Sequence, residues 1–282
     1  MHRIGLTLQR WLPRRWRQTM HISDRLWSGT IQRFPFLNAL SVDEDRRLRL
    51  LCAHFLMEKE FFGAHGLEVT DAIAVTVAAQ ACLPLIHIRP PNGPAGSLGL
   101  EVLDWYDDFV GIVMQPGAAI ARRQRTDEGG VVHHYEEVIA GEAMHRGPVM
   151  LSWQEVSESA EAADSGNNVV IHEFVHKIDM RGMGSADVPD GAPALRKESL
   201  RGIPSRAHWR DTMSEAFAQF RESLALAERF GGETPWLDAY AAQDPAEFFA
   251  VTSEAYFVNR HRFGSDFPSL LALYDTLFRP DV

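Results

Sequence analysis

The chain has 282 residues, 45% of them hydrophobic, which is enough to build a sizeable core in one large domain or two small ones. Its 28 lysines and arginines are outnumbered by 38 aspartates and glutamates, which gives a formal net charge of -10. Because phosphate contacts need clustered cations, this balance argues against direct binding of nucleic acid.

Residues 1–30 form a basic N-terminal segment, which we expect to be a flexible tail. The first 23 residues contain five arginines, among them Arg14 and Arg15, and no acidic residue precedes Asp24. The segment has no uninterrupted apolar core, so no secretory signal peptide is predicted. The tail is either a disordered solubilising end or a segment that touches a partner or an anionic membrane surface.

Residues 31–282 are expected to form one domain, and its first elements are helices. Ser41 and Glu44 form a capping box ahead of apolar residues at helical spacing, which predicts a helix that ends near Gly63. The apolar run 72–86 is shorter than the roughly 20 residues that a bilayer span needs. It therefore predicts a buried helix, and no transmembrane segment is expected.

The two cysteines, Cys52 and Cys82, both lie in these apolar segments. A thiol in such a run usually packs as a small hydrophobic side chain. Two cysteines cannot form a disulfide framework, which is typical of proteins in a reducing compartment such as the cytoplasm.

The middle of the chain changes from helical periodicity to short β-branched runs. Segments 108–116 and 129–153 alternate such runs with glycine and proline, which predicts a small antiparallel sheet. Within them, 147–153 is either an edge strand, to which an extended peptide could add, or an ordinary core strand. Helices before and after the sheet indicate the α+β class, mostly helical with a small antiparallel or mixed sheet.

The segment NNVVIHEFVHKID carries an H-E-x-x-H motif, made by His172, Glu173 and His176. Asn167 or Asn168 can cap a helix here, and helix positions i and i+4 share one face. The two imidazoles can therefore hold one metal ion while Glu173 acts on a bound water as general base. Imidazoles suit Zn²⁺, and a catalytic zinc site has three protein ligands. The motif thus predicts one Zn²⁺ per chain and a third ligand elsewhere.

Two further helices are predicted downstream of the motif. A long one carries Trp209, Met213 and Phe220 on one face and stops at Gly231. A short one covers 267–278, where apolar residues again recur at helical spacing.

A third helix in this region could supply the missing ligand. Asp244 as N-cap and Pro245 at the first helical position begin a helix whose apolar face also carries Glu247 and Glu254. Glutamates on such a face are costly to bury without a partner or a metal, although Glu247 could instead belong to a capping box. The full set of candidates is Asp179, His208, Glu215, Glu247, Glu254 and His261.

Asp179 follows His176 by three residues, near the end of the motif helix. A carboxylate at a helix C-terminus opposes the helix dipole by roughly 0.3–1 kcal/mol, which suggests a compensating role. One such role is to orient a ligand histidine without binding the metal itself. The alternative is that Asp179 is a solvated turn residue.

In these motifs the sequence resembles the zinc-dependent peptidases of the Mlc titration factor A family, cytoplasmic bacterial proteins of the gluzincin type. The matching segments are HEFVHKIDMR, DAYAAQDPAEFFAVTSEAYF, RGPVMLSW and FPSLLALY. HEFVH and AEFFA are also similar, more weakly, to the protease domain of a bacterial lethal-factor toxin. The resemblance extends from Phe34 to the C-terminus and implies a zincin-like metallopeptidase fold.

The resemblance also implies a role for each residue of the site. His172 and His176 would be zinc ligands, Glu247 the third ligand and Glu173 the general base. Tyr240, seven residues before Glu247, would support the transition state. The toxin has a second glutamate where this chain has a valine, so a supporting role for Glu254 departs from that pattern.

Two functions of different classes follow from the resemblance. One is peptide hydrolysis, acting near peptide N-termini like an aminopeptidase. The other is regulation, because members of the named family sequester a transcriptional repressor of sugar uptake genes. The expected partners are therefore a peptide substrate or such a repressor. The glutamate of H-E-x-x-H favours catalysis, since a purely structural zinc site has no need of a base.

Overall fold

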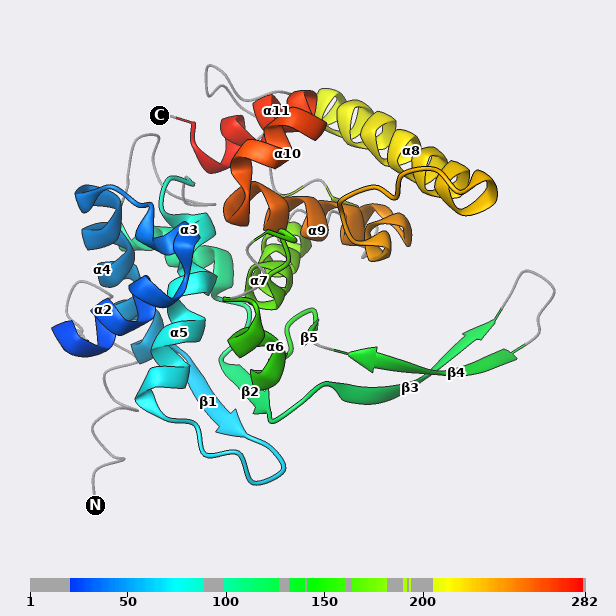
Figure 1. Ribbon diagram of the computed structural model, residues 1–282. Coiled ribbons are helices and arrows are strands. Elements are labelled where there is room, and N and C mark those ends of the chain that lie inside the picture. Colours follow the sequence, from blue (N-terminus) through cyan, green and yellow to red (C-terminus); the bar gives the residue numbers. More distant parts are fainter. Residues whose placement is uncertain are drawn as a thin grey trace.

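The computed structural model describes residues 21–88, 99–126, 132–139, 141–160, 164–181, 190, 191, 193 and 205–280, with only the backbone described for 119–126, 132–139 and 142. Figure 1 shows a body built mainly of helices, with a small sheet and a two-stranded ribbon. The α-helices are α2 Asp24–Arg33, α3 Pro35–Asn38, α4 Val42–Glu58, α5 Asp71–Cys82, α6 Trp153–Glu158, α7 Val169–Met180, α8 Arg206–Phe230, α9 Pro245–Val258, α10 Arg260–Asp266 and α11 Pro268–Phe278. The 3₁₀ helices are η2 Leu83–Leu85, η3 Leu100–Tyr106 and η4 Ala239–Ala242.

The strands form two separate sheets. Their bounds are β1 Glu60–Gly63, β2 Gly111–Gln115, β3 Ala119–Thr126, β4 Val132–Ile139, β5 Gly141–Ala143 and β6 Val149–Ser152. The larger sheet has the order β1-β2-β6-β5, with β1, β2 and β6 parallel and β5 antiparallel to β6. This mixed sheet among many helices confirms the α+β prediction, but within the larger sheet only β5 and β6 pair in the antiparallel direction.

The segment 147–153 contains β6, which lies between β2 and β5. Ile112 pairs with Val149 on one side, and Gly141 pairs with Leu151 on the other. The edge-strand alternative for this segment is therefore wrong, and the core-strand alternative is right. The edge of the sheet on this side is β5.

Strands β3 and β4, which follow β2 and precede β5 in the chain, form an antiparallel two-stranded ribbon. Their pairing runs from Ala119 opposite Ile139 to Thr126 opposite Val132. In Figure 1 the ribbon extends away from the helical body. Because β4 ends two residues before β5 begins, the base of the ribbon leads directly into the edge strand.

Helix α4 begins as predicted and ends earlier. The Ser41 hydroxyl accepts a hydrogen bond from the Glu44 amide at 3.3 Å, and the Glu44 carboxylate accepts one from the Ser41 amide at 2.9 Å. The helix stops at Glu58, not near Gly63, because the following residues form β1 and pair with β2. A long-range strand partner thus overrides the local helical pattern.

The predicted N-terminal tail falls mostly outside the described residues. From Asp24 onward the chain is helical, and α2 buries Trp27, whose indole N–H donates to Asp45 of α4 at 3.0 Å. Residues 24–30 of the segment 1–30 therefore belong to a helix that packs on the body. The five arginines for which contact with a membrane surface was considered lie within residues 1–20, outside the described part of the chain.

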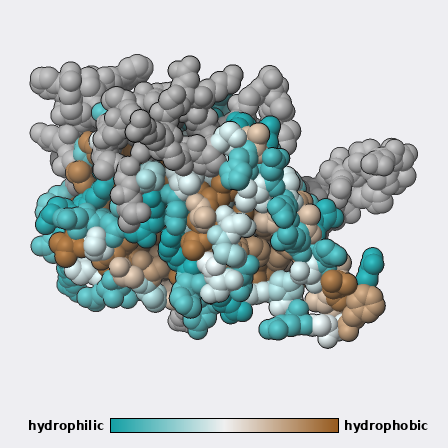
Figure 2. Space-filling model, turned by 90° about the horizontal axis from the view of Figure 1, so that it is seen from above, coloured by the Kyte–Doolittle hydropathy of each residue, from teal (hydrophilic) through white to brown (hydrophobic). Residues whose placement is uncertain are grey.

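Much of the core lies along α5 and α7: α5 packs against α4, and α7 packs against both α5 and α9. Phe174 of α7 packs against Phe55 and Tyr106, with ring centroids 5.7 and 5.0 Å apart. Cys52 and Cys82 are buried free thiols, as predicted from their apolar surroundings. The described part of the face in Figure 2 mixes hydrophilic and hydrophobic residues and shows no single broad apolar surface. Among the described residues, no helix combines the length and apolar character needed to cross a membrane.

Candidate metal centre

Helix α7 carries the H-E-x-x-H motif and is capped by Asn168. The Asn168 side-chain oxygen accepts a hydrogen bond from the Ile171 amide at 2.9 Å, which satisfies a free donor of the first turn. The helix continues to Met180, so His172 and His176 lie one turn apart, with ring centroids separated by 4.7 Å. The sequence prediction of a capped motif helix is confirmed.

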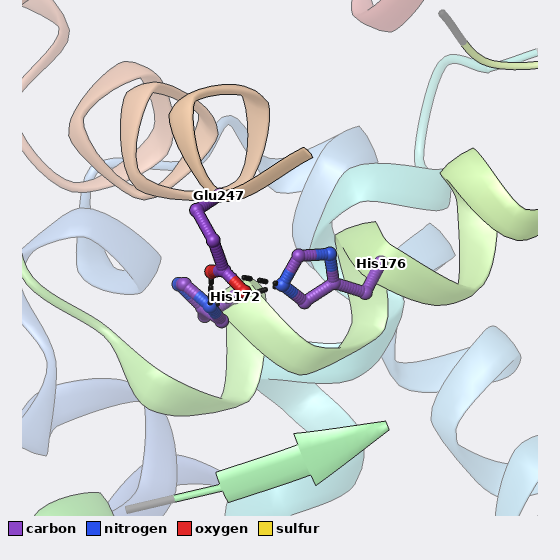
Figure 3. A group of neighbouring side chains, drawn as sticks. All are labelled: His172, His176 and Glu247. Carbon is purple, nitrogen blue, oxygen red and sulfur yellow. Dashed lines mark hydrogen bonds and ion pairs between the residues drawn. The ribbon is translucent and has the colours of Figure 1, made fainter. Parts of the chain in front are cut away.

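Helix α9 brings Glu247 to the two histidines. Asp244 caps this helix by accepting from the amides of Ala246 and Glu247 at 2.8 and 3.0 Å. The Glu247 carboxylate points away from the cap and toward both imidazoles, as Figure 3 shows. The capping-box alternative for Glu247 is therefore not the arrangement in the structure.

Three donor atoms converge at this point. Glu247 Oε2 lies 3.1 Å from His172 Nε2 and 3.3 Å from His176 Nε2, and the two nitrogens are 3.1 Å apart. For zinc bonds of about 2.0–2.1 Å, the edge of a coordination tetrahedron is about 3.3–3.4 Å. The triangle therefore matches one face of such a tetrahedron. The three side chains are 11% to 18% exposed, so the triangle is largely buried but still reaches the surface.

The other candidate ligands lie elsewhere or face the triangle from outside. Among the described residues, His172, His176 and Glu247 are the one group of His, Cys, Asp or Glu side chains close enough to hold a metal ion. Glu254 Oε1 lies 2.7 Å from His172 Nδ1, the nitrogen that points away from the triangle. His208 and Glu215 belong to α8, and His261 belongs to α10.

Asp179 is 1% exposed and lies near the end of α7. Its carboxylate accepts a hydrogen bond from the Gly191 amide at 2.9 Å. This hydrogen bond stabilises the Asp179 carboxylate near the helix C-terminus, where the helix dipole disfavours a negative charge. A role in orienting a ligand histidine stays a prediction.

Glu173 lies on the face of α7 that packs against the edge strand. The residue is 4% exposed, and its Oε2 has no hydrogen-bond partner within the described part of the chain. A Cβ atom on Gly141 of β5 would lie 2.5 Å from Glu173 Oε1 and 2.7 Å from its Cγ. A glycine is therefore required at this position of the edge strand if Glu173 is to keep its place.

The charges at the site favour a bound cation. Burial alone lowers the pKa of His172, but the carboxylates of Glu254 and Glu247 outweigh burial and raise that pKa well above its ordinary value. Burial raises the pKa of Glu173 to about 7, against the attraction of the two histidines. A divalent cation bound at the triangle would compete with protons for these groups.

Tyr240 lies beside the triangle in η4. Its ring centroid is 6.1 Å from that of His172, and the residue is 37% exposed. The Asp238 carboxylate caps η4 by accepting from the Tyr240 amide at 2.9 Å. Tyr240 is therefore a partly exposed neighbour of the His172 ring.

Sequence reasoning missed Gly141 and also Lys177, which is fully buried one turn after Glu173. Lys177 Nζ donates to Asp108 at 3.1 Å and to the carbonyls of Met144 and Gly147. Both residues concern the hairpin formed by β5 and β6: Gly141 lies in β5, and Lys177 donates to carbonyls in the turn between the two strands. The i to i+4 spacing of Glu173 and Lys177 was a visible signal, because it places both on one face of a buried helix.

The fold thus brings together side chains from two helices, α7 and α9, that could hold a metal ion. The sequence matches the family described as Glucose-regulated metallo-peptidase M90 over residues 8–279, and the chain belongs to this family. It is 30% identical to Mlc titration factor A of Salmonella arizonae over 259 residues, which cover 92% of each chain. It is 32% identical to the Klebsiella pneumoniae protein of that name over 88% of this chain and 83% of the relative. It is 32% identical to the Escherichia fergusonii protein of that name, over 84% of this chain and 79% of the relative.

Proposed function

We propose that the chain is a zinc-dependent peptidase of the gluzincin type, in which His172, His176 and Glu247 bind one Zn²⁺. The observation that carries the proposal is the triangle of donor atoms with edges of 3.1 to 3.3 Å. Membership in a metallopeptidase family supports the same conclusion. Two imidazoles and one carboxylate with an accessible fourth position are the donor set of a catalytic zinc site.

The residues around the triangle suit hydrolysis of a peptide bond. A divalent cation at the triangle would polarise the scissile carbonyl and lower the pKa of a nearby water. Glu173 would accept a proton from the attacking water and deliver it to the leaving amine. Tyr240 would donate a hydrogen bond to the developing oxyanion, and this contact strengthens only in the transition state. Glu254 would hold the His172 ring in its binding orientation.

Removal of the metal is the direct test of this proposal. We expect the purified protein to hydrolyse some members of a panel of chromogenic aminoacyl and peptide substrates, and a chelator to abolish the activity. Stoichiometric Zn²⁺ should restore it, whereas Mg²⁺ should not, because imidazole ligands suit zinc and oxygen ligands suit magnesium. Substrates with free and with blocked N-termini, compared at equal concentration, test whether the enzyme is aminopeptidase-like. Hydrolysis that persists after complete metal removal would contradict the proposal.

Gly141→Ala is expected to lower kcat by at least about 10-fold, and by no more than the 10²–10⁴-fold that a general base typically contributes. The new Cβ would meet three atoms of Glu173 at 2.5 to 2.8 Å, so the carboxylate must move. Gly111→Ala in β2 is the matched control, because its nearest contact would be 3.6 Å from Pro148. Steady-state kinetics and zinc content of both variants check this, and equal kcat values would contradict it.

The name of the relatives favours a second function. They are called Mlc titration factor A, a name that assigns them a titrating action on Mlc. We propose that this chain can also bind a transcriptional repressor in the cytoplasm, with peptidase activity secondary or latent until it does so. Zinc bound at the triangle without hydrolysis of any substrate in the panel would favour this function, and the next measurement is then binding of purified Mlc.

A further inference from the structure

A buried chain of hydrogen bonds leads from the metal centre to a helix that supplies no ligand. It begins at Glu254, which is 6% exposed and uses both carboxylate oxygens. Oε1 lies 2.7 Å from His172 Nδ1, and Oε2 accepts a hydrogen bond from the Asn168 amide. The orientation of the His172 ring thus depends on the carboxylate, and the carboxylate depends on the backbone at Asn168.

The side chain of Asn168 has only one orientation that satisfies its neighbours. Its oxygen must face the Ile171 amide, because that amide is a donor and lies 2.9 Å away. The NH₂ group is therefore turned to the other side, where it donates to Gln80 Oε1 at 2.6 Å. Asn168 is 1% exposed, so bulk water does not reach this group.

Gln80 of α5 completes the chain and is fully buried. Its NH₂ group donates to the Thr76 carbonyl at 3.0 Å, and a carbonyl can only accept. The Gln80 oxygen must therefore face Asn168. Both amides thus have a single orientation, set at one end by α5 and at the other by the first turn of α7.

We propose that Gln80 is a positioning residue of the metal centre. It holds the side-chain amide of Asn168, whose oxygen caps α7. The backbone amide of the same residue donates to Glu254, and Glu254 in turn orients His172. Residues that orient a ligand from outside the ligand set commonly change metal affinity when they are replaced. The inference rests on the metal-binding part of the proposed function and does not depend on catalysis.

The test compares Gln80→Met with Val77→Ala, and the readout is the zinc affinity of the purified chain by competition with a chelating indicator. Methionine has nearly the length of glutamine but leaves the Asn168 NH₂ group without its acceptor, so affinity should fall about 10-fold. Val77 is also fully buried in α5 and belongs to no part of the hydrogen-bond chain. Its replacement should lower the unfolding temperature of the metal-free protein and leave zinc affinity unchanged.

A spectroscopic readout separates positioning from stability. With Co²⁺ in place of Zn²⁺, the visible absorption bands should shift in Gln80→Met and keep their positions in Val77→Ala. If Gln80→Met keeps the wild-type zinc affinity, or if both variants lose the same affinity, this inference is overturned and the proposed function is not. If the wild type binds no zinc, the proposed metal centre is wrong and the inference is overturned with it.

Discussion

Glu173→Gln is expected to lower kcat for peptide hydrolysis by about 10²–10⁴-fold, the usual contribution of a general base, with zinc content unchanged. Glutamine has nearly the shape of glutamate but accepts no proton at neutral pH. It should fit between α7 and β5, where Gly141 lies against the Glu173 side chain. Zinc should stay because the donor triangle is formed by His172, His176 and Glu247 alone.

The measurement is kcat and zinc content on the same samples of wild type and variant. Glu222→Gln is a suitable control, because Glu222 is an exposed glutamate on α8. It should behave as wild type in both readouts. Full turnover by Glu173→Gln with zinc bound would exclude Glu173 as the base, and loss of zinc from this variant would mean that Glu173 takes part in metal binding.

The parts of the site that could be predicted from sequence are those set by local patterns. The capped helix α7 follows from Asn168 and the apolar residues after it, and α9 follows from Asp244 and Pro245. Each pattern acts within a few residues, so chain order alone reveals it. Helical periodicity also placed Glu247 and Glu254 on one face, although it could not choose between them as ligand.

The pairing of segments far apart in the chain could not be predicted in this way. The parallel pairing of β1 with β2 joins residues about 50 positions apart, and nothing in the local composition of β1 indicates its partner. The contact of Gly141 with Glu173 depends in turn on the position of β5 at the sheet edge. The hydrogen bond between Gln80 and Asn168 spans 88 positions and likewise has no local signal.

Glu247→Ala is expected to weaken zinc binding strongly. The loss should exceed the roughly 10–100-fold that follows when a residue orienting a ligand from outside the ligand set is replaced. The substitution removes one donor atom from the triangle and leaves two imidazole nitrogens 3.1 Å apart. It also removes a carboxylate that raises the pKa of His172, so protons compete less strongly for that nitrogen. The loss of a donor should outweigh this gain, because zinc needs three protein ligands here. Peptide hydrolysis should be lost with the metal.

Glu254→Gln is the informative comparison for this variant, because Glu254 approaches His172 from the side away from the triangle. It should weaken zinc binding by about 10–100-fold, less than Glu247→Ala, and this order distinguishes a ligand from a residue that orients one. Zinc affinity is measured by competition with a chelating indicator, and circular dichroism checks that the total helical content is unchanged. Stoichiometric zinc retained by Glu247→Ala would assign the third ligand to Glu254 or Asp179. Since Asp179 accepts from the Gly191 amide, that outcome would require its carboxylate to leave this contact.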